Sequence, residues 1–98
     1  MIPVLFSPLA ENDYLDIVDW LSDRSVASAS RFIDAVEQAL KQLRDFPMSG
    51  HESAMLDGPG LRILNVGAWS MIYESGNNRI WIVRLVHGSR ELRSLRIK

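Results

Sequence analysis

The sequence contains no cysteine and only two histidines, His51 and His87, among its 98 residues. Without cysteine the chain forms no disulfide, carries no thiolate nucleophile and offers no thiolate ligand to zinc. A metal site needs several convergent ligands, and the two histidines stand in unrelated stretches of the chain. The composition therefore excludes cysteine-dependent classes of protein, and no metal or cofactor is expected.

Long apolar runs are also lacking, and none reaches the roughly 20 residues that a membrane-spanning helix needs. The apolar start at residues 1–6 is short and has neither a basic leader nor a small-residue cleavage site. It therefore predicts a strand rather than a signal peptide. A length of 98 residues fits one domain over residues 1–98, which we expect to be cytoplasmic and free of membrane contact.

The formal net charge of −1 hides an uneven distribution along the chain. Residues 1–59 carry ten acids against four bases, a balance of −6, and residues 60–98 carry seven bases against two acids, a balance of +5. A basic C-terminal half indicates an anionic partner there, either an acidic polypeptide or a nucleic-acid backbone. The alternative is that these charges only keep a small domain soluble.

Periodicity predicts one strand and then two helices in the first half of the chain. Apolar residues alternate over residues 2–6, as in a short strand. Ser7 and Pro8 follow as an N-cap and a first-turn proline, which open an amphipathic helix over residues 8–22. After a break at residues 23–25, a second amphipathic helix runs until a proline stops it. So short a connection predicts an antiparallel helix hairpin.

The second half predicts three strands, at residues 61–66, 69–74 and 79–86, with a turn at residues 75–78. The last strand is apolar on both faces and is expected at the centre of the sheet, whereas Pro3 favours an edge position for the first strand. The predicted fold is α+β, in the order β-α-α-β-β-β, with the helix hairpin on one face of a small antiparallel sheet. We expect the opposite face to be open and cationic and to dock a partner.

Signals for catalysis are weak. The His-Gly-Ser run at residues 87–89 combines a base and a nucleophile, but neighbouring residues at a strand end rarely face one another. No nucleophile elbow or orienting acid accompanies them. The tryptophans Trp20, Trp69 and Trp81 could stack on single-stranded nucleic acid, although a core or subunit-contact role explains Trp20 and Trp81 better and Trp69 fits either interpretation. Binding rather than catalysis is therefore the expected activity.

Seven short segments, spread over nearly the whole chain, form a specific pattern by their order and spacing. They are Ser7-Pro8-x-Ala10, Ile17-x-x-Trp20-Leu21, Arg31-Phe32-Ile33, Leu43-x-x-Phe46-Pro47-x-x-Gly50, Leu61-Arg62-x-Leu64-x-Val66-Gly67, Ile72-Tyr73 and Val83-Arg84-x-Val86-His87-Gly88-Ser89-Arg90-Glu91-Leu92. Together they resemble the ParE branch of the RelE/ParE toxin superfamily. That family has a helix hairpin packed on a small antiparallel sheet, the same architecture that the periodicity predicts.

The resemblance implies the toxin of a type II toxin–antitoxin pair, bound by a small antitoxin whose C-terminal segment wraps it. ParE-like toxins poison bacterial DNA gyrase, whereas the RelE branch cleaves messenger RNA on the ribosome. RelE-type cleavage needs cations at the scissile phosphate and a late tyrosine or histidine, and the last nine residues hold neither of these two. We therefore interpret the chain as a non-enzymatic gyrase inhibitor that meets nucleic acid only through its antitoxin complex. The alternative is a ribosome-dependent endoribonuclease with His87 as general base.

The chain departs from its relatives at three positions. Relatives commonly carry arginines around the turn at Gly67 and just after Tyr73, where this chain has Ala68, Ser70 and Glu74. These losses leave open a third interpretation, in which the chain is an attenuated toxin homologue that only binds its antitoxin.

Two sets of site residues follow from the resemblance. The residues expected to face the target are Arg62, Arg84, His87, Arg90 and Arg93. The residues expected to face the antitoxin are Tyr14, Ile17, Leu21 and Trp69. As alternatives, Arg62 and Arg90 pair with acids on neighbouring elements, and Arg84 is structural because its strand is buried. The apolar helix face belongs first to the core and touches the antitoxin only along its rim.

Overall fold

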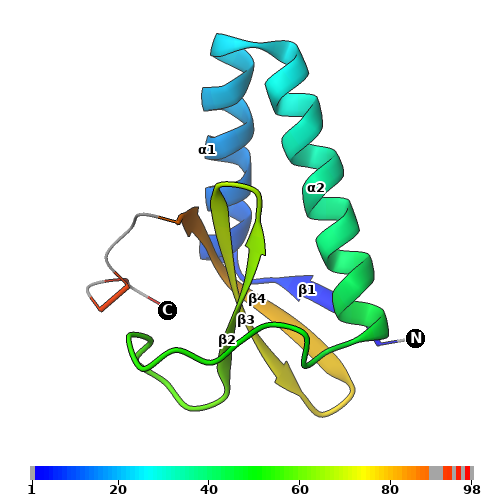
Figure 1. The fold of residues 1–98 in the computed structure, drawn as a ribbon, viewed down its shortest axis with the longest axis vertical. Helices are drawn as coiled ribbons and strands as arrows, with labels where there is room; N and C mark the ends of the chain where they lie inside the picture. Colours follow the sequence, from blue (N-terminus) through cyan, green and yellow to red (C-terminus); the bar gives the residue numbers. More distant parts are fainter. Residues whose placement is uncertain (1, 89–91, 94, 96, 98) are drawn as a thin grey trace.

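The computed structural model describes residues 2–88, 92, 93, 95 and 97 of the chain. Its elements follow in the order β1 (Val4–Phe6), α1 (Pro8–Arg24), α2 (Val26–Asp45), β2 (Leu61–Val66), β3 (Trp69–Gly76) and β4 (Arg79–His87). The two helices form an antiparallel hairpin whose tip projects beyond the strands (Figure 1). Their order matches the predicted β-α-α-β-β-β arrangement, so the α+β prediction is confirmed.

Serine side chains define both helix starts. Ser7 Oγ accepts a hydrogen bond from the Ala10 amide at 3.0 Å, and a proline occupies the first helical position, where its missing N–H costs nothing. Ser25 ends α1 and begins α2: its amide donates to the Leu21 carbonyl, and its Oγ accepts from the Ser28 amide. The predicted three-residue break is therefore a single residue, because one serine serves as both caps.

The four strands have the order β1-β4-β3-β2, which places β4 in the interior of the sheet and β1 at an edge, as predicted. The pairs β2–β3 and β3–β4 are antiparallel, but β1 runs parallel to β4, with Val4 beside Ile80. The sheet is thus mixed rather than wholly antiparallel. The path of the chain explains this. Because α1 and α2 run in opposite directions, the chain enters β2 in the same direction as β1. It then reverses twice, between β2 and β3 and between β3 and β4, so that β4 again runs parallel to β1.

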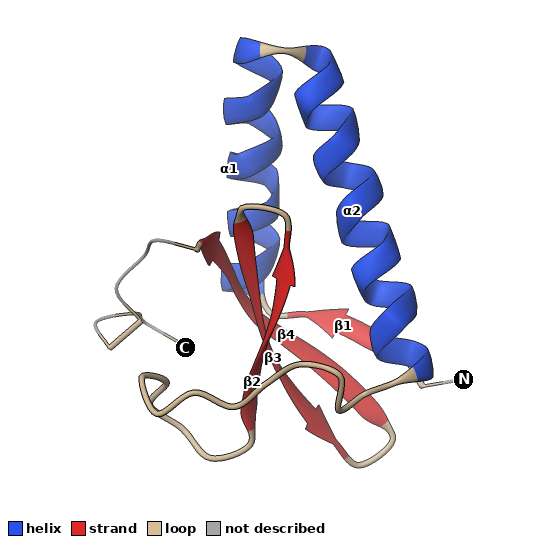
Figure 2. Ribbon diagram, viewed as in Figure 1, coloured by secondary structure: helices blue, strands red, loops and turns tan. Residues whose placement is uncertain are grey.

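The main core lies between the helix hairpin and one face of the sheet (Figure 2). Phe32, Val36 and Leu43 of α2 pack with residues of β3 and β4 such as Met71 and Tyr73, all of them buried. Helix α1 buries fewer residues there, Ala10 and Ile17 among them. Both helices lie on this one side, as their single apolar stripes predicted.

The other face of the sheet carries a second apolar cluster. Strand residues Ile63, Ile72 and Val83 are buried there together with Leu56 of the loop before β2 and Leu95 of the C-terminal segment. The prediction of an open cationic face is therefore wrong. β4 is apolar on both sides because it supplies two cores, and the second of these is covered by the chain's own loop and tail rather than by helices.

The loop between α2 and β2 is held to the sheet at its start. The Tyr73 hydroxyl, which is fully buried, donates to the Pro47 carbonyl at 2.8 Å and accepts from the Gly50 amide at 2.9 Å. Next along the loop, His51 exchanges two backbone hydrogen bonds with Ile63. One buried phenol thus fixes the path of the chain from the end of α2 to the edge strand β2.

Candidate functional site

Arg84 is engaged by helix α1. Its Nε and Nη2 donate to the two carboxylate oxygens of Asp13 at 2.8 and 3.0 Å, a bidentate pair in which both side chains are largely shielded from solvent. The hydrogen bond to Asp13 raises the pKa of Arg84 above its ordinary value, although burial acts in the opposite direction. The cation therefore stays charged and fixed in place.

Asp13 also completes the edge of β4. Strand β1 ends at Phe6, which pairs with Ile82, so β4 continues past its neighbour. The Leu85 amide there donates to Asp13 Oδ2 at 3.0 Å instead of to a strand. One carboxylate of α1 thus accepts hydrogen bonds from both an arginine and an edge amide, and a structural role for Arg84, the alternative stated above, stays a prediction.

Arg62 braces the loop before β2. Its Nη1 donates to the Gly50 carbonyl at 2.7 Å, and its Nη2 lies 3.5 Å from the Glu52 carboxylate, which is exposed. Pairing with an acid of a neighbouring strand or helix was the alternative stated for Arg62; the acid that it meets, Glu52, lies in the loop instead. The short bond to a backbone carbonyl shows that the guanidinium stabilises the loop, whatever else it contacts.

The remaining predicted target-facing residues lie at or beyond the end of β4. His87 is the last residue of β4 and is exposed, with its ring edge-on to Trp69 at a centroid distance of 5.3 Å. Arg93 is exposed in the C-terminal segment. Arg90 lies outside the described residues. The basic C-terminal half seen in the sequence therefore contributes exposed groups near this end of the sheet.

Two of the predicted target-facing residues, Arg62 and His87, lie at different levels of the sheet. In the strand register, Arg62 pairs with Tyr73 and His87 with Trp69, which precedes Tyr73 by four positions in β3. At about 3.3 Å per residue these levels are roughly 13 Å apart. Because Arg62 and Arg84 are also held by Gly50 and Asp13, the structure separates two bracing arginines from an exposed His87 and Arg93.

Aromatic rings link the helix hairpin to the sheet in a continuous row. Phe6 contacts Tyr14, Tyr14 contacts Phe32, and Phe32 contacts Trp69, with centroid distances of 6.1, 5.8 and 5.7 Å. The row continues from Trp69 to Trp20 at 6.4 Å. Three of these four contacts are edge-on and the Tyr14–Phe32 pair is tilted, and such pairs add specific attraction to the burial of apolar area. The row therefore contributes to holding α1 and α2 against the sheet.

The predicted antitoxin-facing residues all belong to this side of the molecule. Tyr14, Leu21 and Trp69 are partly buried at the rim of the main core, while Ile17 is only 7 % exposed and lies inside it. Beside them Trp20 is 49 % exposed, with the Arg24 guanidinium 3.6 Å from its ring centroid. Of the two roles favoured for Trp20 from the sequence, a core residue does not fit its exposure, and a subunit-contact residue stays a prediction: it stands on the flank of α1, with Trp69 edge-on to its ring.

Two functional positions were not found from the sequence. Asp13 looked like one of several acids on the polar face of the first helix, and its pairing with Arg84 spans 71 residues of sequence. Trp20 was considered for nucleic-acid stacking and for packing, but it was not among the residues predicted to face the antitoxin. The one available signal was its place one position outside the apolar stripe, next to Leu21.

Among the residues that the structure describes, no group of three or more histidine, aspartate or glutamate side chains could hold a metal ion. Within the same part of the chain, neither helix has the length and apolar character needed to cross a bilayer.

Two comparisons with known proteins agree with the fold described above. A family model described as the ParE toxin of the type II toxin–antitoxin system parDE matches residues 4–92. A solved structure described as the chromosomal ParDE toxin–antitoxin system from P. aeruginosa superposes with a TM-score of 0.70, at 19 % identity, over 89 % of this chain and 96 % of that chain. The curated proteins contain no match. Because the family model spans nearly the whole described fold, the chain belongs to the ParE toxin family of type II toxin–antitoxin systems.

Proposed function

We propose that this chain is a toxin that inhibits DNA gyrase through protein–protein contact and is neutralised by a cognate antitoxin. The observation that carries the proposal is the match of the ParE family model to residues 4–92, which include both helices and all four strands. The cytoplasm is the compartment in which such a target and such a partner would be met.

The contacts of the basic residues support binding rather than phosphodiester cleavage. Holding a scissile phosphate requires cations that converge on one point. Arg62 and Arg84, however, are oriented by Gly50 and Asp13, and the His87 ring packs against Trp69. Exposed His87, at the C-terminal end of β4, and exposed Arg93, in the C-terminal segment, are the described candidates best placed to contact a target protein.

The antitoxin surface that we propose lies along the rim of the helix hairpin. Tyr14, Leu21 and Trp69 each expose part of an apolar side chain there, and Trp20 exposes about half of one. Aromatic residues with one covered and one open face are the groups that most often anchor protein interfaces. Ile17 supports this surface from within the core.

The gyrase contact can be tested with purified proteins. The wild-type chain should inhibit DNA supercoiling by gyrase, and the double substitution His87→Ala/Arg93→Ala should raise the half-inhibitory concentration roughly 30-fold, which corresponds to the loss of about one interface hot spot. Arg31→Ala is the matched control, since Arg31 is an exposed arginine on α2 whose guanidinium donates a hydrogen bond to its neighbour Ser28. Thermal unfolding should show that the three proteins are equally folded.

Two outcomes would contradict the gyrase proposal. Cleavage of messenger RNA in a translation reaction, abolished by His87→Ala, would instead establish the endoribonuclease alternative. A folded wild-type chain that neither inhibits supercoiling nor arrests growth, yet binds its antitoxin, would identify an attenuated homologue whose Ala68, Ser70 and Glu74 stand where relatives carry arginines.

The antitoxin surface has its own test. Trp20→Ala should weaken binding to the antitoxin, taken from the neighbouring gene, by roughly 30-fold in calorimetric titration, because a central aromatic anchor is removed. The melting temperature should stay within a few degrees of wild type, since Trp20 is half exposed. Val26→Ala at the tip of the hairpin is the control, because Val26 is the most exposed of the large apolar side chains. Equal affinity of all three proteins would remove this flank of α1 from the interface.

A further inference from the structure

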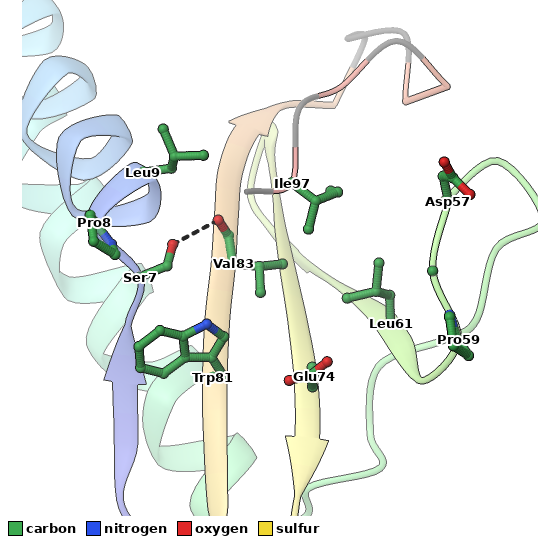
Figure 3. A pocket seen from close by; sticks show the side chains of 11 residues that line it. Ser7, Pro8, Leu9, Asp57, Pro59, Leu61, Glu74, Trp81, Val83 and Ile97 are labelled. Carbon is green, nitrogen blue, oxygen red and sulfur yellow. Dashed lines mark hydrogen bonds between the residues drawn. The ribbon is translucent and has the colours of Figure 1, made fainter.

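The outer face of the sheet contains a cavity of about 730 Å³. It lies between the β1–α1 junction, the loop before β2, strands β3 and β4, and the C-terminal segment (Figure 3). Leu61, Trp81 and Val83 project into it from the strands, and Pro59 and Ile97 approach from the loop and the tail. The cavity is mainly apolar and is of a size that accepts a small ligand or a few side chains.

The free polar side chains of this cavity are hydrogen-bond acceptors. Asp57 on the loop and Glu74 on β3 line it, and neither carboxylate forms an ion pair with any residue that the structure describes. The Ser7 hydroxyl is already used, because it donates to the Val83 carbonyl at 2.9 Å and accepts from the Ala10 amide (Figure 3). No described lysine or arginine lines the cavity. A ligand that donates hydrogen bonds and carries positive charge would complement it.

Trp81 adds a large apolar area to the lining of the cavity. The guanidinium of Arg79, on the same strand, lies 5.3 Å from the centroid of the Trp81 ring, so part of the indole is already in contact with a cation and the rest is what a ligand would meet. Together with Leu61 and Val83 it presents an apolar surface beside the Glu74 carboxylate (Figure 3). An apolar surface next to a carboxylate matches a side chain with an apolar stem and a cationic head.

The described residues of the C-terminal segment show how this face is covered beside the cavity. Leu95 is buried in the second apolar cluster, Leu92 and Ile97 pack against it, and Arg93 is exposed. A polypeptide can therefore pack large apolar side chains on the outer face while a neighbouring base stays exposed. The cavity that Asp57 and Glu74 line adjoins this covered part of the face, because Ile97 both packs against the second apolar cluster and lines the cavity.

We propose that the outer-face cavity binds an arginine or lysine side chain that a partner polypeptide presents beside a large apolar residue. The apolar residue packs on Leu61, Trp81 and Val83, and the cationic head donates hydrogen bonds to Glu74 and Asp57. This surface is on the opposite side of the sheet from the helix hairpin and its aromatic row. It is thus a second recognition site, which stands or fails independently of the gyrase and antitoxin contacts.

The test is a titration of the full chain, ¹⁵N-labelled at tryptophan, with the peptide acetyl-Ile-Arg-Ile-Arg-Ile-amide. The indole N–H resonance of Trp81, identified as the one that Trp81→Phe removes, should shift on binding, while those of Trp20 and Trp69 should not. Replacing both peptide arginines with citrulline, which keeps their shape without the charge, should weaken binding roughly tenfold or more. Glu74→Gln should weaken binding of the arginine peptide by a similar factor, and Asp57→Asn should weaken it less, because Asp57 is exposed.

Glu52→Gln is the matched control, since Glu52 is an acid outside the cavity, and it should leave the affinity unchanged. Equal affinity for the arginine and citrulline peptides would overturn the proposal, as would tighter binding of a peptide with glutamate in their place. The absence of any Trp81 shift at millimolar peptide would overturn it too. A Trp81 shift that depends on protein concentration without peptide would mean that a second copy of the chain occupies the cavity, against the proposal.

Discussion

Replacing Asp13 with alanine should lower the free energy of unfolding by about 3 kcal/mol, because it removes the carboxylate that balances a shielded guanidinium. The carboxylate accepts three hydrogen bonds, two from Arg84 and one from the Leu85 amide. Its loss removes the hydrogen bonds that join α1 to the part of β4 that extends past β1 in this register. Since the chain is small, the melting temperature should fall by about 10–20 °C, measured by circular dichroism.

Asp16→Ala is the control for this prediction, because Asp16 is an exposed acid on the same helix and should change stability little. A double-mutant cycle with Arg84→Met isolates the pair. The double variant should lose clearly less stability than the sum of the losses in the two single variants, because both charges of the pair are then removed together. If the two losses in free energy of unfolding simply add, the two side chains do not stabilise the fold as a pair.

This pairing decides how activity data on Arg84 must be interpreted. An Arg84→Ala chain should lose activity because it unfolds, not because a target contact is removed. Measurement of stability beside activity separates the two causes: His87→Ala/Arg93→Ala should affect inhibition alone, whereas Arg84→Ala should affect both.

Gly50→Ala should lower the free energy of unfolding by about 3 kcal/mol, as much as Asp13→Ala, because the added methyl group overlaps its neighbours and breaks hydrogen bonds. A Cβ atom at this position would lie 2.6 Å from Tyr73 Cε1 and 2.7 Å from the Ile63 carbonyl oxygen. The ring is fully buried and its hydroxyl is bonded on both sides, so it has little room to move. Denaturant unfolding should show the loss as a lower midpoint with an unchanged slope.

Gly76→Ala provides the matched glycine control. A Cβ there would meet nothing closer than the Arg79 carbonyl oxygen at 4.0 Å, so the substitution should be nearly neutral. Tyr73→Phe separates the hydrogen bonds from the overlap: it should cost about 2 kcal/mol, because the Gly50 amide and the Pro47 carbonyl lose their partner. A Gly50→Ala chain as stable as wild type would show that the loop can move away from Tyr73 at little cost.

Local patterns in the sequence were sufficient to predict the elements and much of their arrangement. Ser7 followed by a proline predicted the start of α1, and the structure places both as cap and first helical residue. The asparagines after Gly76 predicted the β3–β4 turn, where Asn78 has a φ of 61°. An apolar run on both faces predicted the interior position of β4. These features depend on residues close in sequence, whose preferences act before any tertiary contact forms.

Only the tertiary structure decided what the charged and exposed residues do. Asp13 and Arg84 are 71 positions apart, and no spacing rule connects a helix acid to one particular strand arginine. The sheet's outer face was expected to be cationic, yet it is a second apolar core, because the loop before β2 and the tail fold back over it. The sequence by itself determined where helices and strands form, since that depends on local periodicity and capping. Which arginines brace the fold and which remain exposed depended on distant segments meeting, and that required the packed structure.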